Sequence, residues 1–116
     1  MNLEKIVKQG ILYDFYGQLL TAHQRAVDED VVLNDMSLAE IAEEQGVTRQ
    51  AVHDLIRRCD RILQDYEDKL GLVAKFRRTR ELTEEIGNLA RQISETGDAS
   101  LAEEIGRLAG RILDEG

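Results

Sequence analysis

The sequence contains no proline, no tryptophan and only one cysteine. Because proline is the residue that most strongly interrupts a helix, its absence favours helices throughout. A single cysteine excludes an internal disulfide and argues against a structural zinc site. The longest apolar runs are only a few residues, as in Val31–Leu33, so we expect no membrane insertion. The first residues mix charged with apolar side chains, unlike a signal peptide. These absences predict an all-α, cytoplasmic protein.

Residues that carry catalysis or bind metals are also scarce. His23 and His53 are thirty positions apart and have no second ligand at helical spacing. Cys59 is in register with apolar neighbours, and free cysteine is usually buried, so we predict a core residue there. The sequence has no Ser/His/Asp order, glycine-rich phosphate loop or HExxH motif. We therefore predict no catalytic residues, no metal site and no cofactor, and a protein that is not an enzyme.

Apolar residues recur at helical spacing from the start of the chain. Residues 3–16 are predicted to form a first helix that Gly17 ends. Thr21-x-x-Gln24 is a capping box, in which each side chain bonds the backbone N–H of the other residue, so a second helix is expected directly after it. The inward positions predicted for the first helix are Leu3, Val7, Ile11 and Phe15, with Ile6 and Leu12 widening the stripe, and those for the second are Ala26, Val27 and Val31.

Residues 37–57 have the pattern of a helix-turn-helix. Ser37-x-x-Glu40 is a second capping box that opens a short helix, and Gly46 stands where that helix must end in a left-handed conformation. Val47 is predicted to fill the corner and Thr48 to cap the next helix. That long recognition helix is expected from residue 49 to about residue 70. Its predicted buried stripe comprises Val52, Leu55, Cys59, Ile62, Leu63, Tyr66 and Leu70.

The other side of the long helix is the face that a recognition helix presents to a groove. The predicted nucleic-acid or partner contacts on it are Arg49, Gln50, His53, Arg57 and Arg61. A second basic cluster follows the break expected at Gly71. Its residues are Lys75, Arg77, Arg78 and Arg80. This cluster is predicted either to contact RNA or an acidic surface, or to be only the solvated start of a helix.

The C-terminal part of the chain contains an internal repeat. Residues 82–97 recur as residues 101–116, with nine of sixteen positions identical. Each copy predicts one amphipathic helix, and two such helices bury little area alone, so we expect them to dock on the main domain or on a second protomer. The sequence thus predicts a helix-turn-helix domain over residues 1–71 and a C-terminal helical hairpin over residues 72–116, in a homo-oligomer held through helical surfaces.

Positive charge is in deficit, with 15 Lys and Arg against 23 Asp and Glu and a net charge of −8. Binding to duplex DNA draws much of its affinity from counterions released by basic side chains, and this charge would slow the encounter with nucleic acid. The balance favours either recognition of a short nucleic-acid feature by a few arginines or docking to a basic protein. Sequence-specific DNA binding by a dimer with locally positive faces stays open.

Two resemblances follow from particular strings. Residues 20–58 resemble region 4 of bacterial sigma factors, but Ala51 and His53 stand where that region usually has more arginine, which disfavours promoter recognition. The strings that carry this resemblance are Leu20-Thr21, Gln24-Arg25, Ser37-Leu-Ala-Glu-Ile-Ala42 and Gly46-Val-Thr-Arg-Gln-Ala-Val52.

A longer resemblance, over most of residues 3–80, is to the YlxM family, small helix-turn-helix proteins of Gram-positive-type bacteria. It rests on residues 4–8, 12–17, 19–21, 29–30, 34–35 and 37–57, and on Leu63-x-x-Tyr66-Glu67. The repeated tail is expected to lie outside it. The resemblance implies an accessory of the signal recognition particle pathway that binds the particle's GTPase or its small RNA. The alternatives are a DNA-binding transcriptional regulator and a scaffold that oligomerises through its hairpin.

Overall fold

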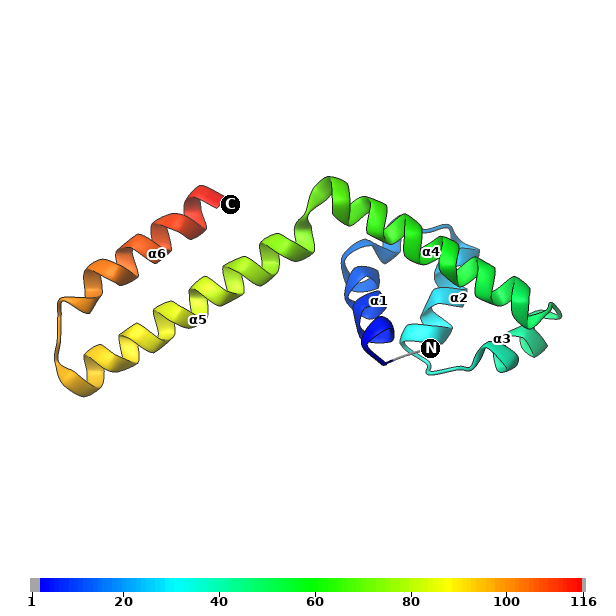
Figure 1. Cartoon of the computed structure of the whole chain (residues 1–116), viewed down its shortest axis with the longest axis horizontal. Coiled ribbons are helices and arrows are strands. Elements are labelled where there is room, and N and C mark those ends of the chain that lie inside the picture. Colours follow the sequence, from blue (N-terminus) through cyan, green and yellow to red (C-terminus); the bar gives the residue numbers. More distant parts are fainter. Residues whose placement is uncertain (1–2, 116) are drawn as a thin grey trace. The chain divides into compact units, whose positions relative to one another are not determined.

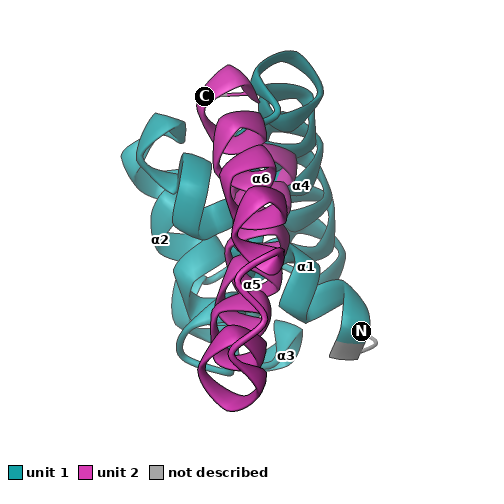
Figure 2. Ribbon diagram, turned by 90° about the vertical axis from the view of Figure 1, so that its left-hand side faces the viewer, with its two compact units in different colours: residues 1–73 teal, residues 74–116 magenta. Residues whose placement is uncertain are grey.

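The computed structural model describes residues 3–115, and every regular element in that range is a helix (Figure 1), which confirms the all-α prediction. The chain divides into two compact units, residues 1–73 and 74–116 (Figure 2). The helices, with one 3₁₀ turn, are α1 (Leu3–Tyr16), η1 (Gly17–Leu19), α2 (Ala22–Val32), α3 (Leu38–Gln45), α4 (Arg49–Leu70), α5 (Leu72–Thr96) and α6 (Leu101–Glu115).

The helix ends follow the predicted capping chemistry. Thr21 Oγ1 accepts a hydrogen bond from the Gln24 backbone N–H at 3.2 Å, and the Gln24 side chain accepts one from the Thr21 N–H at 3.1 Å. Ser37 and Glu40 form the same reciprocal pair at the start of α3. Each pair satisfies N–H groups that have no partner inside the helix. Both predicted capping boxes are confirmed.

In the first unit, α4 packs against α1, α2 and α3. Its N-terminal half belongs to a core shared with α2 and α3, formed by Val27, Val31, Ile41, Ala42, Val52 and Ile56. Its C-terminal half belongs to a second core, shared with α1 and the first turn of α5. That core consists of Leu12, Tyr16, Leu20, Leu63 and Val73. Cys59 is fully buried, as predicted.

The buried face of the first helix is shifted from the one expected. Leu12, at the edge of the predicted stripe, is buried together with Gln9 and Tyr16, whereas 54% of Val7 and 37% of Phe15 are exposed. Both sets fit a helical period, and the packing of α1 against α2 and α4 selects the former. Gly17 also departs from the prediction, because it starts η1 instead of simply ending α1. A Cβ at this position would lie 2.6 Å from the Tyr13 ring, which explains the glycine.

Three further burial predictions are wrong. Ala26 is exposed and its neighbour Asp28 is buried instead. Leu70 is 55% exposed, because the stripe of α4 loses its cover in the last turn, and Val47 is 49% exposed. Val47 lines a surface cavity of about 360 Å³ together with Val52 and Leu55, and so it borders a groove without filling the corner.

The start of α5 is held by side chains from α1 and α4. The Tyr16 hydroxyl donates to Glu67 Oε1 at 2.5 Å and accepts a hydrogen bond from the Leu72 N–H at 3.1 Å. The Val73 N–H donates to the same Glu67 oxygen at 2.9 Å. Two N–H groups of the first turn thus find partners, and the chain restarts as a helix immediately after Gly71, whose φ is +62°.

In the second unit, α6 runs back along α5 (Figure 1). Arg78 Nε lies 2.6 Å from Glu115 Oε1, which joins the early part of α5 to the end of α6. Leu82 on α5 and Leu108 on α6 are buried. The first repeat copy and the basic cluster lie on one continuous helix of 25 residues.

Candidate partner-binding face of the helix-turn-helix

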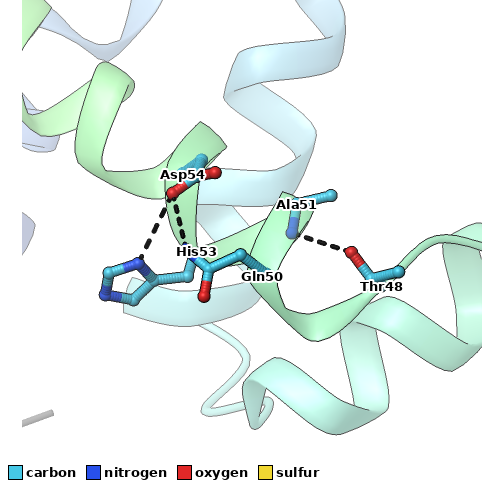
Figure 3. Close-up of polar contacts among 5 residues, drawn as sticks. All are labelled: Thr48, Gln50, Ala51, His53 and Asp54. Atoms are coloured by element: carbon cyan, nitrogen blue, oxygen red, sulfur yellow. Dashed lines mark hydrogen bonds and ion pairs between the residues drawn. The ribbon is translucent and has the colours of Figure 1, made fainter.

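The turn between α3 and α4 positions the start of the recognition helix. Gly46 has the predicted left-handed conformation, with φ +68°. The Val47 N–H donates to the Ala42 carbonyl at 3.0 Å across this turn. Thr48 Oγ1 then accepts a hydrogen bond from the Ala51 N–H at 3.1 Å (Figure 3). Because these bonds fix both helix ends, the side chains that follow project from a defined backbone.

The first predicted contact set lies together on the N-terminal two thirds of α4. Arg49, Gln50, Arg57 and Arg61 are exposed, and His53 is only half-exposed. Arg58, which the predicted set omitted, is exposed as well and lines a shallow surface depression. The residues that line it are Asp54, Arg57, Arg58 and Arg61. We call residues 49–61 of α4, with these exposed side chains, the arginine face.

An acidic side chain lies in the middle of the arginine face. Asp54 Oδ1 accepts a hydrogen bond from Gln50 Nε2 at 2.9 Å, and His53 Nδ1 lies 3.8 Å from the same oxygen (Figure 3). The Gln50 amide is therefore already engaged by Asp54. The contacts predicted from the sequence omit Asp54, although its four-residue spacing from Gln50 is a signal that the two side chains can pair.

The charges around this face are unevenly distributed. Residues 49–61 contain four arginines and two aspartates, a local charge of +2. The preceding 48 residues contain three Lys and Arg against nine Asp and Glu, and Glu40, Glu43 and Glu44 on α3 are exposed. The arginine face is thus a small positive area within an acidic unit, suited to a few strong contacts instead of a long phosphate track.

The second predicted set lies on the early turns of α5, in the other unit. Lys75, Arg77, Arg78 and Arg80 are all exposed. Arg78 is bound to Glu115, and that hydrogen bond is the largest reason why the pKa of Arg78 is raised. Arg80 Nε lies 3.4 Å from Glu84 Oε1. Carboxylates of the same unit therefore neutralise part of the positive charge of this cluster.

Other functional chemistry finds little support in the described chain. Within residues 3–115, no three His, Cys, Asp or Glu side chains are grouped so that they could hold a metal ion. Burial, followed by the charge of Asp28, raises the pKa of the Cys59 thiol to about 11, which keeps it protonated and unreactive. None of the described helices combines the length and apolarity needed to cross a membrane.

A short helix, a left-handed glycine turn and a capped, arginine-bearing second helix define a helix-turn-helix protein. Residues 3–103 match the family described as "Putative helix-turn-helix protein, YlxM / p13 like", UPF0122. A UPF0122 protein of Bacillus pumilus is 42% identical over 99 residues, which cover 85% of this chain and 90% of that protein. The UPF0122 protein YlxM of Bacillus subtilis is 44% identical over 90 residues, or 78% of this chain and 82% of that one. The chain belongs to this family.

The family match reaches further than expected. It continues through residue 103, so the first copy of the repeat lies inside the family pattern, and the expectation that the whole repeated tail lies outside it is wrong. The continuity of α5 from residue 72 to residue 96 gives a physical reason, because the first copy extends a helix that begins in the core of the first unit.

Proposed function

We propose that this protein is an accessory of the signal recognition particle pathway and that it binds the particle's GTPase or its small RNA through the arginine face. The family resemblance supports the pathway. The single observation that carries the mode of binding is the exposed N-terminal part of α4, where Arg57, Arg58 and Arg61 line one depression with Asp54. No catalytic role is assigned to any residue.

The chemistry of the arginine face favours a short, defined target over a long duplex. Arginine forks can bind phosphates or carboxylates with two parallel hydrogen bonds. Asp54 adds an acceptor, which suits an amino or guanidinium donor on the partner and opposes a nearby phosphate. The surrounding negative charge of the unit would suppress non-specific phosphate contacts and leave selective ones.

The test is a titration of the full chain against the purified GTPase, the small RNA and duplex DNA at two salt concentrations. Arg57→Ala is expected to weaken binding to the true partner about tenfold, as expected for one arginine contact worth 1–3 kcal/mol. Arg91→Ala, which removes an exposed arginine of the second unit, is the control and is expected to leave the affinity unchanged. Equal affinities for Arg57→Ala, Arg61→Ala and the unmodified chain would refute the assigned face.

A second substitution separates the two partners. Asp54→Asn removes one negative charge and retains an oxygen that can accept the Gln50 hydrogen bond. It is expected to strengthen binding to RNA, because one repulsion with phosphate disappears, and to weaken binding to a basic surface of the GTPase. Isothermal titration calorimetry with each partner gives the sign of the change. No change with either partner would remove Asp54 from the contact.

The second candidate function is a DNA-binding transcriptional regulator. The observation that favours it is the helix-turn-helix itself, whose second helix exposes Arg49 and Gln50 at its N-terminal end, the part that reads base edges in such proteins. Binding to duplex DNA alone, with a clear sequence preference and no affinity for the GTPase or the RNA, would establish this function in place of the first.

A further inference from the structure

The two helices of the second unit cover only part of the apolar stripe that the repeat places on them. Leu82 and Leu108 are buried, with only 4% and 2% of their surface exposed, but the rest of the stripe stays partly exposed. The partly exposed positions are Ile86, Leu89, Ile93, Leu101, Ile105 and Ile112. A two-helix layer has no third element to complete a core, so apolar area remains available.

One side of this hairpin is charged. Arg78 on α5 is hydrogen-bonded to Glu115 on α6. The pKa of Arg107 on α6 is raised mainly by its bond to Glu104 on the same helix, and further by the charge of Glu85 on α5. At 100° per residue, all five side chains lie on the same flank of the apolar stripe of their helix. When two antiparallel helices face each other, equivalent flanks of their stripes lie on the same side of the hairpin. We call the side that carries these five residues the charged side.

The opposite side carries small, uncharged residues. By the same helical geometry, the other flank of each stripe holds equivalent positions of the two repeat copies. They are Thr83, Gly87 and Ala90 on α5, and Ala102, Gly106 and Ala109 on α6. All six are exposed. We call this set the small-residue side. It is bordered by Leu113, of which 81% is exposed.

The packing of this chain gives no steric reason for the two glycines of the small-residue side. A Cβ at Gly87 or Gly106 would meet no other atom within 4 Å, apart from the helix's own backbone and immediate neighbours. Glycine inside a helix weakens it relative to alanine. Small residues at such positions allow the backbone of another helix to approach closely, and the half-exposed stripe beside them offers the apolar area for that approach.

We propose that the small-residue side binds a second copy of this chain, so that the two hairpins stack as two layers of two helices each. The repeat makes this side nearly two-fold symmetric, and a copy rotated by half a turn presents the same residues, as a closed dimer requires. The side carries no charge, so a copy of itself buries no ion, whereas RNA or a charged peptide would lose solvation without compensation. This association is independent of the partner that α4 binds.

The available area suits a weak dimer. The 15 residues of α6 span about 22 Å, and two helices of roughly 10 Å width give about 900 Å² for both copies together. That is near the lower limit of roughly 1,000 Å² for a specific interface, so a dissociation constant in the micromolar range is expected.

Sedimentation equilibrium of the full chain from about 1 to about 100 µM tests the proposal over the expected range of dissociation constants. The monomer mass is 13.1 kDa, and twice that mass is expected at the upper concentrations. Ala90→Glu places a charge on the small-residue side and is expected to weaken association at least tenfold. Gln92→Glu, an exposed change of the same charge two residues away on the charged side, is expected to leave association unchanged.

Gly106→Ala serves as a second variant, because it favours the helix and yet obstructs close approach. It is expected to weaken the dimer while circular dichroism shows unchanged or greater helix content, so a loss of folding cannot account for the result. A chain that stays monomeric up to about 100 µM would overturn the proposal. So would a dimer that neither Ala90→Glu nor Gly106→Ala weakens.

Discussion

Asp28 has the least favourable environment of the carboxylates in the described chain for which a pKa shift is resolved. It is 1% exposed, and its Oδ2 oxygen has no hydrogen-bond partner among residues 3–115. Burial, followed by the charges of Asp60 and Glu29, raises the pKa of its carboxyl to about 6. Because its pKa is raised by folding, this carboxyl stabilises the folded state when it is protonated and destabilises it when it is ionised. Its stabilising contribution is complete below pH 4 and is lost as the pH rises through about 6.

Asp28→Asn is therefore expected to stabilise the fold at neutral pH. The substitution removes the penalty of an ionised buried group, and the free energy of unfolding at pH 7 should rise by about 2 kcal/mol. At pH 4, where the native carboxyl is protonated, the gain should largely vanish. Urea unfolding at both pH values measures the difference. Asp65→Asn, at an exposed site of α4, is the control, and an equal gain at both pH values would contradict the assigned pKa.

At the scale of elements, the turn between α3 and α4 determines how the arginine face is presented. Gly46 has a φ of +68°, which residues with a Cβ rarely adopt. No atom beyond its immediate chain neighbours would touch an added Cβ within 4 Å, so the requirement is one of backbone conformation and not of space. The same absence of contact holds at Gly10, inside α1.

Gly46→Ala and Gly10→Ala form a matched pair with opposite expected signs. The first should lower the free energy of unfolding by about 1–2 kcal/mol, because alanine is strained in the left-handed region. The second should raise it by up to about 1 kcal/mol through better helix propensity. Both changes lie in the same unit, so one urea titration followed by circular dichroism compares them directly. A loss at Gly10 as large as at Gly46 would show that the added methyl group, and not φ, causes the effect.

At the scale of the whole molecule, charge decides what kind of nucleic-acid binding is available. The net charge is −8, and the densest group of exposed cations in the first unit is the four arginines of α4. Such a surface releases few counterions on binding, so affinity must come from directed contacts and not from a general attraction to phosphate.

The salt dependence of binding to RNA or duplex DNA should therefore be shallow. With at most four arginines in contact, a plot of log K against log salt should have a slope no steeper than about −4. Arg57→Ala should reduce the magnitude of that slope by about 1. Fluorescence anisotropy across a salt series gives both values. A slope of about −6 or steeper would mean that basic residues outside α4, such as the cluster from Lys75 to Arg80, also contact phosphate.

Much of the candidate site could be predicted because its signals are local. The exposure of Arg49, Arg57 and Arg61 follows from the period of the helix that carries them. The engagement of Gln50 by Asp54 was not predicted, because a pair four residues apart can form or stay open. The helical period and the turn determine which side chains the arginine face exposes. They do not select among RNA, protein and DNA as its partner.

The sequence by itself determined the helix-turn-helix. Its capping boxes, the left-handed glycine at position 46 and the extent of α4 depend on hydrogen bonds and backbone preferences within a few residues. Only the tertiary structure decided that α1 turns Tyr16 inward in place of Phe15, that Asp28 is buried, and that the two sides of the C-terminal hairpin differ in charge. These outcomes depend on which helices meet, and a periodic pattern that fits two faces equally well cannot choose between them.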